Sequence, residues 1–133
     1  MKPILYVLVR TDLDSMTPGR VAAQVGHAVS VFHGMMERAD PETDLFNMYT
    51  KWKSETPYGY GTKIILDGQN LDRLLEELYK IPGDLVSSLS RCITDPEYAV
   101  RDGEVIHILP VDTCAFAFVD ADNYSFSLEL YNG

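Results

Sequence analysis

The sequence predicts a three-layer α/β/α domain with a mixed, mostly parallel four-stranded sheet and an extra hairpin near the C-terminus. Ile4 to Val9 is a continuous apolar run, typical of a strand covered on both faces. A long amphipathic helical pattern follows, and Thr62 to Leu66 then reads as a second strand. A strand, helix, strand progression implies right-handed crossovers and therefore a largely parallel sheet.

Length and composition indicate an ordinary globular protein. The chain has 133 residues, of which 46% are hydrophobic and 23% are charged, and we expect residues 1–133 to form one domain. The initial apolar run is only about six residues long, too short for a signal peptide or a membrane span. We therefore expect a cytoplasmic protein that does not act at a membrane.

Neither a cofactor nor a metal is indicated by the sequence. Cys92 and Cys114 lie in apolar segments without a CxxC motif or a Cys/His cluster, which favours buried, reduced thiols. The connector from Thr56 to Gly61 contains two tyrosines among glycines and a proline, but it lacks the spacing and the lysine of a phosphate loop.

The first helix is predicted to begin at Thr17 and Pro18, where a hydroxyl can cap free amides and proline needs no donor. One face is apolar, with Val21, Val25, Ala28, Val29 and Phe32. A second stripe brings together a cation, an amide and an imidazole, in Arg20, Gln24, His27 and Val31. The positive helix start with Arg20 suits a phosphate or a developing oxyanion.

Two further helices are predicted. The first helix should run through Glu37, because Asp40-Pro41 is the next breaker, and a capped start at 40–43 leads into a second helix. We interpret the aromatic and methionine stripe of that second helix as core, and Trp52 could equally be a contact residue. Asp67-Gly68 reads as a turn, and Asn70 can cap a third helix that ends before Pro82-Gly83.

The last part of the chain is predicted to consist of strands. Leu85 to Ile93 reads as a third strand, with Asp95 just after it, and Val105 to Leu109 as an inserted strand or hairpin. Cys114 to Val119 and the alternating segment from Tyr124 to Tyr131 read as further strands, the latter at an exposed edge. If the third strand runs parallel to the first, Asp95 and Asp12 both open onto a crevice beside Arg20.

The charge is unusual for a protein that binds nucleic acid. Eleven Lys and Arg face twenty Asp and Glu, which gives a net charge of −9. Proteins that neutralise phosphates usually carry a basic surface. A local positive patch near the strand ends could still be formed by a few cations, namely Arg10, Arg20, Lys51, Lys53 and Lys63.

Three successive motifs resemble the amino-terminal signature of the archaeal and eukaryotic type of peptidyl-tRNA hydrolase, the Pth2 family. They are Leu8-Val9-Arg10-Thr11-Asp12-Leu13, Gly19-Arg20-Val21-Ala22-Ala23-Gln24 and His27-Ala28. The resemblance implies the sheet order 2-1-4-3 with the fourth core strand antiparallel. It also implies a functional aspartate after the third strand, which is Asp95 here.

The chain departs from the family pattern in two places. Arg20 stands where the family has lysine, so an electrostatic role survives but a proton-transfer role does not. After the third strand the family has Asp-Ala-Gly-Arg-Thr-Gln, whereas residues 95–100 here are Asp-Pro-Glu-Tyr-Ala-Val. Arg101 could replace the missing arginine, and Thr113 could match a later family threonine.

The resemblance implies an esterase that hydrolyses peptidyl-tRNA or N-blocked aminoacyl-tRNA and releases free tRNA. The catalytic residues would be Arg20, Asp95 and His27, and substrate would be bound by Asp12, Gln24, Arg10, Arg101 and Thr113, without metal or cofactor. As an alternative, His27 and Gln24 could simply satisfy loop carbonyls. The chain could also be an inactive binding module of this fold, or hydrolyse another small ester or amide. A homodimer is a further open alternative.

Overall fold

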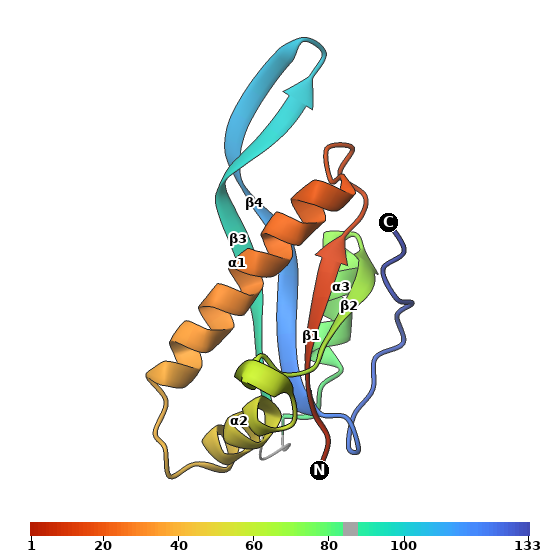
Figure 1. The fold of residues 1–133 in the computed structure, drawn as a ribbon. Helices are drawn as coiled ribbons and strands as arrows, with labels where there is room; N and C mark the ends of the chain where they lie inside the picture. The colour runs from red at the N-terminus through yellow and green to blue at the C-terminus, as the bar shows by residue number, and fades with distance from the viewer. Residues whose placement is uncertain (84–87) are drawn as a thin grey trace.

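The protein is described by a computed structural model that covers residues 1–83 and 88–133 (Figure 1). Its elements, in order, are β1 (Pro3–Arg10), α1 (Pro18–Glu37), α2 (Asp44–Ser54), the short 3₁₀ helix η1 (Pro57–Gly59), β2 (Lys63–Gln69), α3 (Leu71–Tyr79), β3 (Ser88–Asp102) and β4 (Val105–Asp120). The sheet order is β2-β1-β4-β3. Because β1 and β2 are parallel and β4 is antiparallel to both β1 and β3, the predicted order and directions are confirmed.

Helices cover both faces of the sheet, so the three-layer prediction is confirmed. Alternate residues of β1 point to opposite faces. Leu5, Val7 and Val9 pack in the cluster that contains the buried residues of α1 and α2. Ile4, Tyr6 and Leu8 pack in the second cluster, which contains Leu74 of α3. Figure 1 shows α1 crossing the near face of the sheet, with α3 behind it.

β1 is an inner strand, as its continuous apolar sequence predicts. It is hydrogen-bonded to β2 on one side and to β4 on the other. Its residues from Pro3 to Val9 are buried. The strand ends at Arg10, where polar residues begin, so the loop that leads to α1 starts at the carboxyl edge of the sheet.

The three predicted helices are present, with one difference in capping. Thr17 is the N-cap of α1, but its hydroxyl makes no capping bond, and its carbonyl accepts from Val21 N at 2.9 Å. The proline at the first helical position has no N–H to satisfy, so it reduces the number of free amides at this helix start. Thr43 and Asn70 cap α2 and α3 through their side-chain oxygens, as the sequence suggests for both helix starts.

The core interpretation of the aromatic stripe on α2 is confirmed by Trp52. Its side chain is completely buried, and its Nε1 donates to the carbonyl of Thr62 at 2.8 Å. Gly61 lies against the indole with φ of 70°, and a Cβ there would be 2.0 Å from the ring. Only glycine fits this position, so the connector between α2 and β2 is held tightly to the core.

Asp67-Gly68 was predicted as a turn, and that prediction is wrong. Both residues lie inside β2, which continues to Gln69. A Cβ on Gly68 would be 3.0 Å from the carbonyl oxygen of Val9, so glycine allows β2 to approach β1 closely at this position.

The predicted edge strand from Tyr124 to Tyr131 is also wrong. Among residues 1–83 and 88–133, a single isolated bridge, between Leu66 and Leu130, joins the segment to the sheet. Phe126 instead packs edge-on against Tyr6, with ring centroids 5.1 Å apart. The aromatic alternation therefore reflects packing over the sheet and not strand pairing.

The two long strands β3 and β4 extend past the sheet as a hairpin arm, which Figure 1 shows projecting from the body. Val105 to Leu109 is paired with residues 98–102, so the predicted hairpin is confirmed, although it is the continuation of β3 and β4 and not a separate strand. Of the predicted third strand, residues 85–87 lie outside the described part of the chain.

The two cysteines are free, in accord with the prediction of reduced thiols. Cys114 is buried, and burial raises the pKa of its thiol to about 12. Cys92 is only half-buried, so the expectation of burial holds for one of the two. No described helix is both long enough and apolar enough to span a membrane.

Candidate functional site

Asp95 lies inside β3 at a bulge, and not just beyond the end of a strand as predicted. It pairs with Val111, and Tyr98 pairs with Leu109, so two residues of β3 face one residue of β4 between these pairs. Both strands have proline at this point, Pro96 and Pro110, which cannot donate a ladder hydrogen bond. A bulge bends the strand and redirects side chains, and here it carries a carboxylate that α1 contacts.

A chain of side-chain hydrogen bonds joins β4, α1 and β3. The hydroxyl of Thr113 donates to Gln24 Oε1 at 2.6 Å. Gln24 Nε2 then donates to Asp95 Oδ2 at 2.7 Å. Thr113 and Gln24 are both buried. Because the hydroxyl occupies the amide oxygen, the amide nitrogen must face Asp95, and this relay (Thr113, Gln24, Asp95) has a single direction.

The relay keeps Asp95 ionised. Donation from Gln24 is the largest cause that lowers the pKa of this carboxyl group, and the backbone N–H of Glu97 (2.9 Å) and the nearby His27 act in the same direction, against the effect of burial. A carboxylate with a lowered pKa is a poor proton acceptor at neutral pH. Asp95 is therefore better suited to orient a neighbouring group and to stabilise positive charge on it.

His27 is the neighbouring group that Asp95 can orient. Its Nε2 lies 3.9 Å from Asp95 Oδ2, and its side chain is 56% exposed against 15% for Asp95. At that distance there is no direct hydrogen bond, but one water molecule can bond both atoms. The two side chains line a hollow of ≈ 430 Å³ together with Val31, Ile93, Thr94, Pro96 and Glu97.

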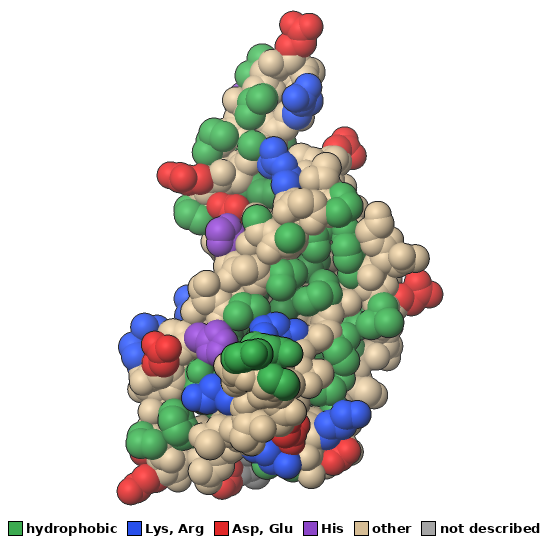
Figure 2. Space-filling model, in the orientation of Figure 1, with side chains coloured by type: hydrophobic (Ala, Val, Ile, Leu, Met, Phe, Trp, Pro, Cys, Tyr) green, Lys and Arg blue, Asp and Glu red, His purple; other side chains and the backbone are tan. Residues whose placement is uncertain are grey.

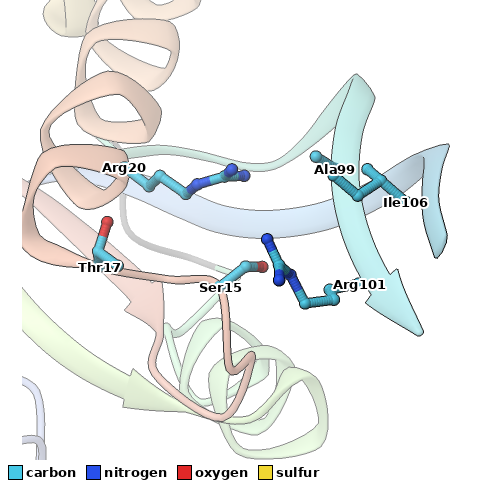
Figure 3. A pocket seen from close by; sticks show the side chains of 6 residues that line it. All are labelled: Ser15, Thr17, Arg20, Ala99, Arg101 and Ile106. Atoms are coloured by element: carbon cyan, nitrogen blue, oxygen red, sulfur yellow. The ribbon is translucent and has the colours of Figure 1, made fainter. Parts of the chain in front are cut away.

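A second hollow, of ≈ 210 Å³, lies between the start of α1 and the hairpin arm. We call it the arginine hollow, and its lining residues are Ser15, Thr17, Arg20, Ala99, Arg101 and Ile106. Figure 3 shows Arg20 reaching from α1 toward the arm and Arg101 reaching back from the arm toward the loop before α1. Two cations and two hydroxyl groups thus face one space, and the described lining contains no carboxylate.

Arg10 and Asp12 are bound to each other. Arg10 Nε and Nη2 donate to the two oxygens of Asp12 at 3.0 and 2.9 Å, and Nη1 donates to the carbonyl of Asp112 at 3.0 Å. The hydrogen bond between them is the first cause that raises the pKa of Arg10 and lowers that of Asp12. This pair fixes the loop after β1 to β4.

The structure distributes the predicted site residues over adjoining hollows and not in one crevice. Gln24, His27, Asp95 and Thr113 belong to the relay and its hollow, whereas Arg20 and Arg101 line the arginine hollow. Asp12 lines a third hollow, which shares Ser15 and Arg101 with the arginine hollow. The cause is that the hairpin arm continues past Asp95 and carries Arg101 toward the start of α1.

Tyr98 and Ser15 are site residues that the sequence reasoning missed. The Tyr98 hydroxyl and Ser15 Oγ are 2.8 Å apart, and the Arg20 guanidinium lies over the Tyr98 ring, 5.6 Å from its centroid. Tyr98, three residues after Asp95 in β3, is therefore a buried side chain on which Arg20 packs. Its local sequence, Glu97-Tyr98-Ala99-Val100, shows no alternation that would have predicted its burial. Among residues 1–83 and 88–133, no group of three or more His, Cys, Asp or Glu side chains is placed to hold a metal.

Comparison with known families gives one result. The family model described as Peptidyl-tRNA hydrolase PTH2 matches residues 4–84, from β1 to just past α3. A search of curated proteins gave no match. The matched part contains Arg10, Asp12, Arg20, Gln24 and His27, whereas the residues contributed by β3 and β4 lie beyond it. The match covers more than half of the chain and agrees with the sheet order, and the chain belongs to the peptidyl-tRNA hydrolase PTH2 family.

Proposed function

We propose that this protein hydrolyses the ester bond of peptidyl-tRNA or N-blocked aminoacyl-tRNA and releases free tRNA. The relay carries the proposal, because a buried hydroxyl and a buried amide together hold one carboxylate beside an exposed imidazole. Family membership supplies the reaction class. Residues 1–133 would act as one domain in the cytoplasm, with no metal or cofactor.

In the proposed reaction, a water molecule bonded to His27 and Asp95 attacks the ester carbonyl carbon. His27 takes one proton from the water while Asp95 stabilises the resulting imidazolium, since its lowered pKa keeps it charged. The bond between the carbonyl carbon and the ribose oxygen then breaks. That oxygen receives the proton from His27, and the peptide leaves as a carboxylic acid, which releases the second proton of the water to solvent and becomes a carboxylate. The proposed hydrolysis needs neither a covalent intermediate nor a cofactor.

The arginine hollow would hold the negative groups of the substrate. Arg20 and the first amides of α1 can stabilise the oxyanion or the terminal phosphate, and Arg101 adds a second cation from the arm. Arg20 and His27 are both exposed on α1, seven residues or about 10 Å apart along the helix, so a substrate lying along α1 would reach both. Arg10 and Asp12 would support this arrangement by fixing the loop that carries Ser15.

A binding module without catalysis is the second candidate. Three observations favour it: arginine replaces lysine at position 20, residues 95–100 depart from the family segment, and the net charge is −9. Such a module would bind tRNA, or another partner, through the same hollows and leave the ester intact. Hydrolysis of a different small ester or amide is a third candidate that uses the same chemistry.

The experiment that separates these candidates is hydrolysis of N-acetyl-aminoacyl-tRNA in the presence of EDTA. We expect release of the N-acetylated amino acid by the wild-type protein, and equal release by Asp72→Asn, a matched control on the exposed side of α3. If tRNA binds but no ester is cleaved, the binding module is correct. If tRNA neither binds nor reacts while a small ester is cleaved, the third candidate is correct.

A further inference from the structure

A second cationic surface lies away from the relay, around the end of α2, η1 and the start of β2. We call it the basic-aromatic patch and define it by Lys53, Tyr58, Tyr60 and Lys63. In Figure 2, Lys, Arg and His side chains gather around a hydrophobic projection over η1 and α2. The two tyrosines are those of the connector, and the proposed reaction gives them no role.

Tyr58 is held in an unusual conformation. Its side chain is 100% exposed, and its φ is +62°, a backbone conformation that bulky residues rarely adopt. The backbone beside it is fixed: Gly61 N donates to Thr56 Oγ1 at 2.7 Å, and Gly61 lies on the Trp52 ring. A left-handed non-glycine residue persists only where its surroundings enforce it, and such residues cluster at functional sites. The fold therefore presents a fully open aromatic ring from a rigid loop.

The two lysines of the patch are placed by aromatic rings. Lys53 Nζ lies 4.4 Å from the centroid of Tyr49, and Lys63 Nζ lies 5.2 Å from that of Trp52 while donating to the carbonyl of Tyr60. Within the described ranges, neither lysine forms an ion pair with a carboxylate. Lys51, by contrast, is paired with Glu55.

Glu37 is one acidic group whose charge reaches this region, since it raises the pKa of Tyr49 as a smaller cause after burial. Burial lowers the pKa of Lys63, so an approaching anion would favour its charged form. The chain as a whole has a net charge of −9. Within its described residues, Lys53 and Lys63 have no carboxylate partner, and the exposed ring of Tyr58 belongs to the same patch. An anionic ligand with a flat ring therefore fits this place.

We propose that the basic-aromatic patch binds a single-stranded stretch of RNA, with a base stacked on Tyr58 and backbone phosphates near Lys53 and Lys63. Single-stranded nucleic acid is bound by this combination of aromatic platforms and cations, because each base has a π-face and each phosphate a charge. An acidic peptide would use the lysines but would not need a rigid, fully exposed ring. RNA is therefore the occupant that both observations favour.

The patch lies at the other end of α1 from the arginine hollow. His33, beside Trp52 and Lys63, is thirteen residues after Arg20, which corresponds to about 20 Å along the helix. Several nucleotides span such a distance, so one RNA can contact both places. The inference takes its biological partner from the proposed function, but binding at the patch does not require that the ester be cleaved.

The test measures binding directly, by fluorescence anisotropy of a labelled twelve-nucleotide oligouridylate at low salt, with the intact protein. Tyr58→Ala should raise the Kd about five-fold or more, the effect of losing one stacked base. Tyr79→Ala is the matched control, since Tyr79 is 81% exposed on α3, which packs on the opposite face of the sheet from α2. Lys53→Gln should reduce the slope of log Kd against log salt by about 0.7, the value for one phosphate on a single strand.

Each outcome of the binding test either supports or overturns the inference. A selective loss with Tyr58→Ala, restored by Tyr58→Phe, supports the patch even if the protein hydrolyses no tRNA ester. Absence of RNA binding by the wild type, or equal affinities of Tyr58→Ala and Tyr79→Ala, overturns the inference even if hydrolysis is observed. Binding of a poly-glutamate peptide with loss by Lys53→Gln, but no RNA binding, would assign the patch to an acidic protein partner and overturn it as well.

Discussion

Thr113→Val removes the first donor of the relay while keeping the shape of the side chain. In the wild type, the Thr113 hydroxyl bonds the buried Oε1 of Gln24 at 2.6 Å. Valine leaves that oxygen without a donor, at a cost of about 1–3 kcal/mol in the free energy of unfolding. For a chain of this length, each kcal/mol corresponds to about 4 °C, so Tm should fall by about 4–12 °C.

The same change should act on the carboxylate at the far end of the relay. Without the hydroxyl, the oxygen of the Gln24 amide is no longer fixed, so the amide is held less firmly beside Asp95 and the donation that lowers the pKa of Asp95 is weakened. The pKa of Asp95, followed by carboxyl NMR titration, should therefore rise. Thr94→Val is the control, because its hydroxyl is exposed and water can replace its hydrogen bond. A Thr113→Val protein with unchanged stability and an unchanged pKa of Asp95 would refute the relay.

Three further changes test other parts of the structure. Gly61→Ala should destabilise the protein by about 2–4 kcal/mol in urea unfolding, because a Cβ would enter the Trp52 ring at a left-handed backbone position, and unchanged stability would refute this packing. The hydrogen bond from Arg10 lowers the pKa of Asp12, so the stabilisation from this pair is complete above about pH 4 and is lost as the pH falls through the folded-state pKa of Asp12. In Asp12→Asn, the free energy of unfolding should therefore depend less on pH in this acid range. Arg20→Ala should raise KM and lower kcat in the hydrolysis assay, and Arg20→Lys should retain much of the activity; equal loss in both would show that charge alone is insufficient.

Local sequence patterns predicted the elements that are determined by local chemistry. The apolar run of β1, the period of α1 and the cap of α3 at Asn70 each depend on near neighbours in sequence. The inner position of β1 followed from its lack of polar residues. Gln24 and His27 were correctly placed near Asp95, because helix spacing and strand direction together limit where these side chains can lie.

The arrangement of the site depended on long-range contacts that no local pattern encodes. The bulge at Asp95 arises from the pairing of two strands, and the bond from Thr113 to Gln24 joins residues 89 positions apart. The arm that carries Arg101 toward α1 was predicted as a hairpin but not as an extension of both strands. For the same reason, the packing of Arg20 on Tyr98 was not foreseen.

Asp95→Asn tests the central claim most directly, because it changes charge and proton affinity with little change of shape. The measurement is kcat and KM for hydrolysis of N-acetyl-aminoacyl-tRNA in EDTA, with Asp72→Asn as the matched control. If Asp95 stabilises the charged form of His27 during attack by water, kcat should fall about 100-fold or more while KM changes little. Unchanged kcat in Asp95→Asn would contradict the proposed role of the relay.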